Sequence, residues 1–108
     1  MAIDYAKLQT DIMAARAAAT VADPIDDGGT CNLDDIFLIL PHANEAKMRK
    51  IADATGSYLR KSKWLGTTGY FVSVPANGQA NRRAVMVEAG YKKLRELGWN
   101  VHHYMQMD

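Results

Sequence analysis

One segment of the chain places anion-binding residue types at the predicted start of a helix. Residues 75–83 read PANGQANRR, with a glycine, three side-chain amides and two arginines. The free N–H groups and the positive dipole end of a helix N-terminus favour anions, so arginines there need a neutralising partner. Either Asn77 or Asn81 caps the helix while Arg82 and Arg83 are solvated or pair with Asp34 or Asp35, or the segment binds an anionic ligand.

A second polar segment, residues 26–35, leads into an apolar run. Thr, Asn and Asp at the start of a strand either satisfy loop backbone groups or line a site. Whether the two segments meet depends on strand register. We expect them to form one site for a nucleotide or another phosphate-bearing ligand, built from Thr30, Asn32, Asp34, Asn77, Gln79, Asn81, Arg82 and Arg83.

Metal and catalytic chemistry have weaker support in the sequence. Cys31 is the single cysteine, which excludes a cysteine-based zinc site within one chain. His102 and His103 are adjacent on a predicted strand, so they point to opposite faces and cannot bind one metal together. No acid/base pair or nucleophile with its base stands at a recognisable spacing. We therefore expect a protein that is not an enzyme and that carries no metal or cofactor; a small enzyme using Cys31 or a histidine is the remaining alternative.

Hydrophobic periodicity and capping residues define the elements that must position these side chains. An Ala-rich amphipathic helix comes first and ends at Asp23-Pro24, which separates residues 1–22 from an α/β domain at 23–108. Asn44 caps the next helix and Gly56 ends it. In chain order we predict a helix at 4–21, a strand at 31–40, a helix at 44–56, a strand at 58–64, a turn at 66–69, a strand at 70–74, a helix at 77–98 and a strand at 99–105.

The order after the first helix is β-α-β-β-α-β, which predicts a ferredoxin-like α+β fold with an antiparallel sheet. Its two crossovers place both helices on one sheet face and leave the other face open. Because the first strand is apolar on both faces, either the N-terminal helix or a second subunit must cover that face. The two solutions are compatible, and a homodimer is one expectation.

Composition limits the partners. The 108 residues carry 13 Lys and Arg against 12 Asp and Glu, so the net charge of +1 attracts neither nucleic acid nor a membrane strongly. Local patches differ, because aspartates gather at 23–35 and basic residues at 47–63. An alternative function is therefore a protein-protein inhibitor that uses these charged patches. Without an apolar run of 18 residues or a secretion signal, we expect a cytoplasmic protein with no membrane contact.

Two resemblances add to these expectations. The pattern GTCNxD at 29–34 with QANRR at 79–83 resembles small uncharacterised proteins of phages and other mobile elements, from about Gly28 to the end. This resemblance implies a binding role, such as sequestering a nucleotide signal or blocking a host defence complex in the manner of an anti-CRISPR protein. Tyr70 and Phe71 are similar in topological place to the stacking aromatics of ribonucleoprotein-type RNA-binding domains, which makes RNA a further candidate partner.

Overall fold

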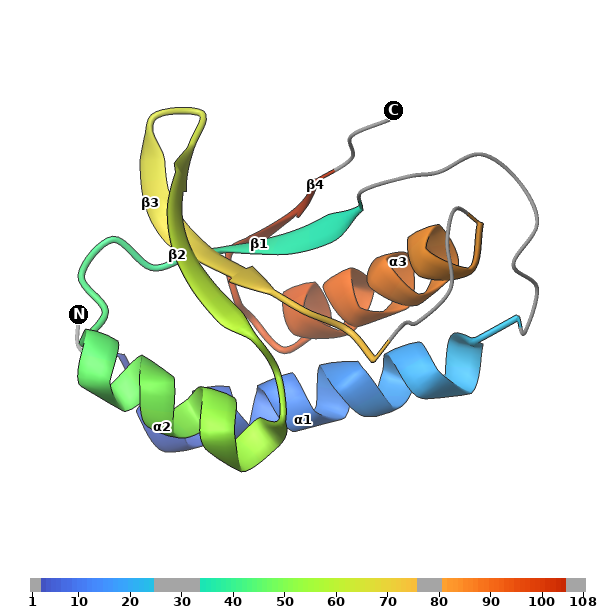
Figure 1. The fold of residues 1–108 in the computed structure, drawn as a ribbon, viewed down its shortest axis with the longest axis horizontal. Coiled ribbons are helices and arrows are strands. Elements are labelled where there is room, and N and C mark those ends of the chain that lie inside the picture. Colours follow the sequence, from blue (N-terminus) through green and yellow to red (C-terminus); the bar gives the residue numbers. More distant parts are fainter. Residues whose placement is uncertain (1–2, 25–33, 76–80, 105–108) are drawn as a thin grey trace.

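A computed structural model describes residues 3–24, 34–75 and 81–104. A four-stranded antiparallel sheet lies on one side of the molecule and the helices lie on the other (Figure 1). The strand order is β2-β3-β1-β4. The predicted α+β class with an antiparallel sheet and a preceding helix is confirmed. The elements are α1 (Tyr5–Ala22), β1 (Asp35–Ile39), α2 (Glu45–Thr55), β2 (Leu59–Trp64), β3 (Thr67–Val72), α3 (Asn81–Glu96) and β4 (Val101–Tyr104).

Capping residues explain where the helices begin and end. The Asp4 carboxylate accepts the Lys7 N–H at the start of α1, and the Asn44 side chain accepts the Lys47 N–H at the start of α2. Each cap satisfies one of the N–H groups that a helix start leaves without an intrahelical partner. Gly56 ends α2 in the left-handed conformation, with φ of 73°. Asn44 and Gly56 therefore cap α2 as predicted.

The hairpin between β2 and β3 corrects the predicted turn. Residues 67–69 belong to β3, and the turn lies at Leu65-Gly66 instead. Both turn residues have positive φ, 54° for Leu65 and 76° for Gly66. Such a two-residue turn matches the right-handed twist of the paired strands, and glycine adopts it without strain. The prediction was wrong here because leucine is a poor signal for a turn.

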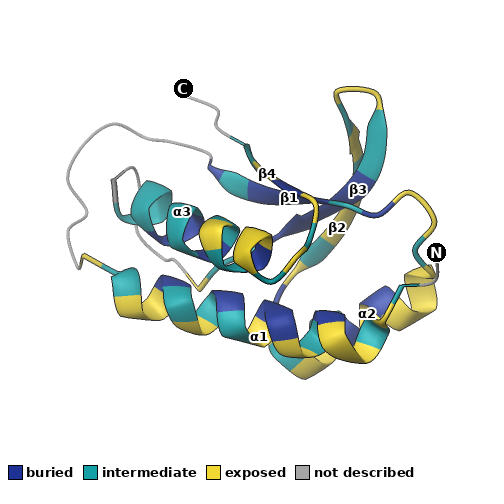
Figure 2. Ribbon diagram, turned by 180° about the vertical axis from the view of Figure 1, so that it is seen from behind, coloured by how far each residue is buried: buried dark blue, intermediate teal, exposed yellow. Residues whose placement is uncertain are grey.

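Helix α1 does not cover the open face of the sheet. It packs beside α2 and α3 on the same side of the sheet, as Figures 1 and 2 show from opposite directions. Its buried Leu8 and Ile12 join the core under the sheet with Leu38 of β1 and Val87 of α3. Of the two covers that the sequence left open for the second sheet face, the N-terminal helix is therefore the wrong one. The helical stripe of α1 matches the groove between the other two helices instead.

Three polar contacts fasten α1 to the C-terminal half of the chain. The Lys7 ammonium donates to the carbonyl oxygen of Leu97 at 2.8 Å. The Trp99 indole N–H donates to the buried Asp11 carboxylate, also at 2.8 Å. Further along the helix, Arg16 donates to the carbonyl oxygen that follows β3, at Ser73. These contacts fix the register of α1 on the rest of the fold.

The other face of the sheet is rich in aromatic side chains. Five rings form one connected cluster there, which we call the aromatic face: Phe37, Trp64, Phe71, His102 and Tyr104. Phe37 at its centre is 0% exposed. A Cβ on Gly69 would lie 2.9 Å from the Phe37 ring and 2.3 Å from a backbone oxygen of β1, so only glycine fits beneath this ring.

Register explains which side chains reach which face. Tyr70 points to the helices and Phe71 to the aromatic face, because neighbouring residues of a strand alternate. His102 and His103 also separate, as predicted: His102 contacts Trp64 on the aromatic face and His103 contacts α3. Among the helices that the structure describes, none has the length and apolar content to cross a membrane.

Candidate functional site

The structure describes part of the predicted ligand cluster. Asp34, Arg82 and Arg83 are described, and Asn81 is the first residue of α3. The predicted ligand residues Thr30, Asn32, Asn77 and Gln79, and the side chain of Asn81, lie outside the described residues. The site prediction for these five therefore stays a prediction.

The two polar segments do meet through their described residues. The Arg83 side chain at the start of α3 donates to the backbone oxygen of Asp34 at 2.7 Å. Arg82 makes a two-pronged ion pair with Asp23, with N–O distances of 2.8 and 2.7 Å. This pairing neutralises the charge that led us to expect an external anion. Asp23 follows the end of α1. The strand and helix patterns of the sequence do not indicate that it pairs with Arg82.

The carboxylate of Asp34 has a structural partner. It is 2.8 Å from Nε2 of His103, whose Nδ1 is 2.6 Å from Glu88. The imidazole thus bridges two carboxylates, one from the residue before β1 and one from α3. Since Asp34 is only 2% exposed, it cannot contribute to an acidic docking surface of the kind that the inhibitor alternative uses.

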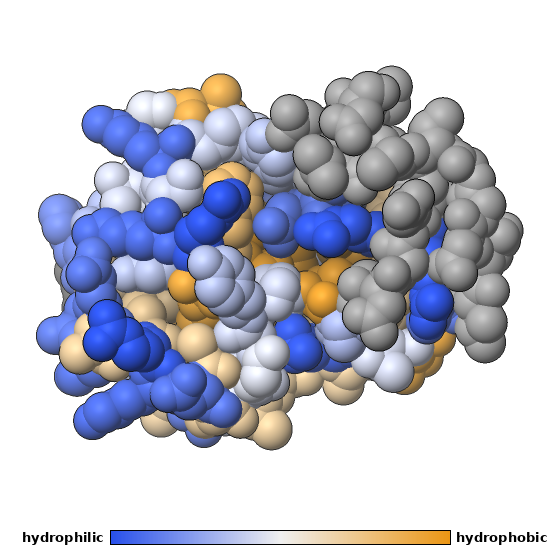
Figure 3. Space-filling view, in the orientation of Figure 1, coloured by the Kyte–Doolittle hydropathy of each residue, from blue (hydrophilic) through white to orange (hydrophobic). Residues whose placement is uncertain are grey.

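A pocket of about 730 Å³ opens elsewhere, between α2 and β2. These two elements make few contacts with each other, because α2 packs mainly against α1. The space between them is walled by apolar side chains such as Met48 and Leu59 and bordered by charged ones. Figure 3 shows hydrophilic side chains gathered over the α2 region, with apolar surface visible among them. The lining residues are Glu45, Met48, Arg49, Ala52, Asp53, Gly56, Ser57, Tyr58, Leu59, Lys61 and Tyr70.

The Tyr70 hydroxyl has no hydrogen-bond partner among the described residues, although it is buried. The residue is 3% exposed and lines the pocket from β3. Burial, reinforced by the charge of Glu45, raises the pKa of this phenol above its ordinary value, against the lowering effect of Lys61. A buried hydroxyl normally finds a partner, so an unpartnered one beside a pocket marks a place where a ligand atom would be favoured.

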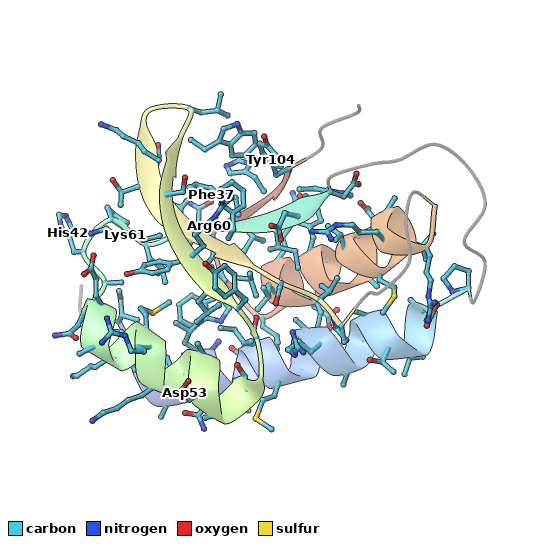
Figure 4. All side chains as sticks on the ribbon, viewed as in Figure 1. Phe37, His42, Asp53, Arg60, Lys61 and Tyr104 are labelled. Atoms are coloured by element: carbon cyan, nitrogen blue, oxygen red, sulfur yellow. The ribbon has the colours of Figure 1, made fainter. Side chains whose placement is uncertain are left out.

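The border of the pocket carries both paired and unpaired charges. Lys61 of β2 and Glu45 of α2 form an exposed ion pair at 2.7 Å across the pocket. Arg49 and Asp53, one turn apart on α2, make no hydrogen bond or ion pair with any described residue and are exposed. Figure 4 shows Asp53 on α2 and Lys61 on β2 on either side of this space. A free guanidinium and a free carboxylate are therefore available to a bound molecule.

An exposed ring completes the border. Tyr58 is 69% exposed and stands where the chain enters β2. Its backbone N–H donates to the Ser73 hydroxyl at 2.8 Å, which fixes the start of the strand. A tyrosine ring held by its backbone and open to solvent presents a surface on which a planar group stacks.

Sequence reasoning missed this pocket. Tyr70 was singled out for the open face, whereas register turns it toward the helices, and Tyr58 was assigned only to a strand. The available signal was the run of basic residues at 47–63, which includes Arg49 and Lys61. That run did not indicate a pocket, because the space depends on how far α2 stands from β2.

The described side chains offer no metal centre. Among residues 3–24, 34–75 and 81–104, no group of three His, Cys, Asp or Glu side chains could hold a metal ion. Comparison with protein-family models, with curated proteins and with solved structures finds no match to this chain.

Proposed function

We propose that this chain is a non-enzymatic binding module that takes a small phosphate-bearing ligand, such as a nucleotide, in the pocket between α2 and β2. The observation that carries the proposal is the buried, unpartnered Tyr70 hydroxyl at this pocket. Leaving a buried hydroxyl without a partner costs about 1–3 kcal/mol, and a ligand atom that accepts or donates a hydrogen bond there recovers part of it.

The border groups match the parts of a nucleotide. Arg49 supplies a guanidinium that binds phosphate oxygens in two-pronged fashion. The Tyr58 ring provides a stacking surface for a base, and the Asp53 carboxylate accepts hydrogen bonds from sugar hydroxyls. This assignment keeps the ligand class that the sequence predicts and moves its site away from Arg82, whose charge Asp23 neutralises.

The wider identity of the protein belongs to the same proposal. The strand order β2-β3-β1-β4, with crossover helices α2 and α3 on one side, supports assigning the ferredoxin-like fold. A phage or mobile-element origin and a cytoplasmic location are proposed with it. For a protein in that setting, binding a nucleotide signal would be a means of acting without catalysis.

Titration calorimetry with adenosine monophosphate, and separately with inorganic phosphate, tests the proposal. Tyr70→Phe removes only the hydroxyl, so we expect affinity for the nucleotide to fall about five-fold. Arg49→Gln removes the phosphate partner and should weaken binding of both probes by about ten-fold or more. Tyr91→Phe and Lys50→Gln are matched controls outside the pocket and should bind as the unmodified protein does.

Native mass spectrometry of protein purified from cells gives a second readout. A retained small phosphorylated adduct that Arg49→Gln abolishes would support the proposal. If neither probe binds at millimolar concentration and no adduct is retained, or if Arg49→Gln and Lys50→Gln bind equally well, the proposed ligand class is wrong.

A further inference from the structure

The aromatic face has an architecture independent of the pocket. Cross-strand pairing places Phe37 opposite both Phe71 and His102, and alternation brings Trp64 and Tyr104 to the same side. Centroid separations between these rings run from 5.0 to 5.9 Å. The rings meet edge to face, at interplanar angles of 60° to 78°. No pair in this cluster stacks face to face.

The cluster has buried inner rings and accessible outer rings. Phe37 and Phe71 are 0% and 7% exposed, while Trp64 and Tyr104 are half-buried and His102 is exposed. The inner pair completes the sheet's second layer, as a small core would. The outer rings contribute less to that core and present surface to the outside. Two half-buried aromatic rings 5.1 Å apart form a platform on which planar groups can stack.

Positive charge accompanies this platform. The Arg60 guanidinium lies 5.0 Å from the centre of the Phe71 ring and makes no hydrogen bond or ion pair with any described residue. Figure 4 shows Phe37, Arg60 and Tyr104 close together among the strands. Strand β2 reads LRKSKW and contains no acidic residue; alternation places Ser62 on this face with Arg60 and Trp64, whereas Lys63 turns to the other face with Lys61. Asp35, opposite Tyr104, is the acidic neighbour; burial raises its pKa despite Arg83 and Arg60.

We propose that the aromatic face binds single-stranded nucleic acid. Bases stack on Trp64 and Tyr104, and Arg60 binds a phosphate of the backbone. Stacking rings next to the Arg60 guanidinium suit a flexible polyanion whose bases are exposed, whereas a duplex keeps its bases stacked internally. A second copy of the chain is the competing occupant of this face, and the oligomeric state distinguishes it from nucleic acid.

This surface and the pocket use opposite faces of β2. Arg60 and Trp64 point to the aromatic face, whereas Lys61, between them, crosses to Glu45 at the pocket. Variants at one site therefore leave the other unchanged. Loss of nucleotide binding in Arg49→Gln with normal oligonucleotide binding would show that the two proposals stand or fall separately.

Fluorescence anisotropy with labelled oligo(dT) and oligo(U) of about 12 nucleotides tests the inference, with a duplex of equal length beside them. We expect Trp64→Ala to weaken binding about ten-fold or more, and Tyr104→Phe, which keeps its ring, to bind nearly normally. Arg60→Gln should weaken binding several-fold. It should also reduce the slope of the logarithm of affinity against the logarithm of salt concentration by about one, as expected for the loss of one phosphate contact. Lys50→Gln, an exposed cation on α2, is the control. The ratio between the two oligonucleotides shows whether RNA or DNA is preferred.

Three results would overturn the inference. One is equal binding by Arg60→Gln and Lys50→Gln, which is informative even if Trp64→Ala unfolds, because Arg60 is exposed. Another is a duplex that binds as tightly as the single strands. The third is a concentration-dependent dimer in analytical ultracentrifugation that Arg60→Gln or Trp64→Ala disperses, which would identify a second copy as the occupant.

Discussion

Replacing Tyr70 by phenylalanine should make the protein more stable. The hydroxyl is buried, with less than 1 Å² exposed and no partner among the described residues. Burying it unpaired costs about 1–3 kcal/mol, and its removal loses only the dispersion contacts of one oxygen. We expect the free energy of unfolding to rise by about 1 kcal/mol. For a domain of this size that corresponds to a melting temperature about 4 °C higher.

Urea unfolding followed by tryptophan fluorescence, together with a thermal melt, measures this change. Tyr5→Phe is a control of opposite sign, because the Tyr5 hydroxyl accepts the Asn44 backbone N–H at 2.8 Å. Removing that partner should lower stability by about 1 kcal/mol. If Tyr70→Phe destabilises as much as Tyr5→Phe does, the Tyr70 hydroxyl has a partner within the folded protein, and the reasoning from an unpartnered group is refuted.

Alkaline pH gives an independent check on Tyr70. Its folded pKa is raised above the ordinary value of 10.0, chiefly by burial. The unfolded chain therefore loses this proton more readily than the folded one, and stability falls as pH rises through 10 toward the folded pKa. Tyr70→Phe should make the decline above pH 10 less steep. An equally steep decline in both proteins would show that Tyr70 does not contribute to it.

The remaining predictions concern single contacts, each measured by chemical unfolding. Leu65→Asn should raise the free energy of unfolding by about 1 kcal/mol. Leu65 is 77% exposed and has φ of 54°, and asparagine before glycine suits this turn. A loss of stability would contradict the turn assignment. Gly69→Ala should lower stability by about 1–3 kcal/mol, because the added Cβ meets Leu38 backbone; an unchanged midpoint would disprove that contact. His103→Ala should lower the free energy of unfolding by about 3 kcal/mol, because it leaves the buried Asp34 carboxylate without its imidazole partner. The double variant Asp34→Asn/His103→Ala should lose less stability than His103→Ala alone, and an equal or larger loss would contradict this coupling.

Local signals predicted the elements well where capping residues and periodicity agree. Asn44 and Gly56 bracket α2 in the sequence as they do in the structure. The stripe of Leu8 and Ile12 identified the buried side of α1. The Leu65 turn was not predictable, because leucine with positive φ is tolerated only where the paired strands impose it.

Tertiary placement was harder to predict. The periodicity of α1 shows which side is buried but not against what, and two surfaces were available to it. The partner of Arg82 was missed for the same reason: Asp23 is 59 residues away, and only the docking of α1 against α3 brings them together. The pocket depends on the gap between α2 and β2, a distance that no residue pattern encodes. The aromatic face was foreseen only through Phe71.

The attachment of α1 has a consequence for how the chain folds as it is made. This helix is synthesised before the other described elements, yet its contacts through Lys7 and Asp11 are to Leu97 and Trp99, which follow α3. Until those residues emerge, α1 can pack against α2 but lacks its contacts with α3, and the closing contacts span loops of 88 and 90 residues. Folding of this domain is thus completed only after Trp99 has emerged, and a nascent chain halted before α3 would keep an exposed Ala-rich helix within reach of chaperones and proteases.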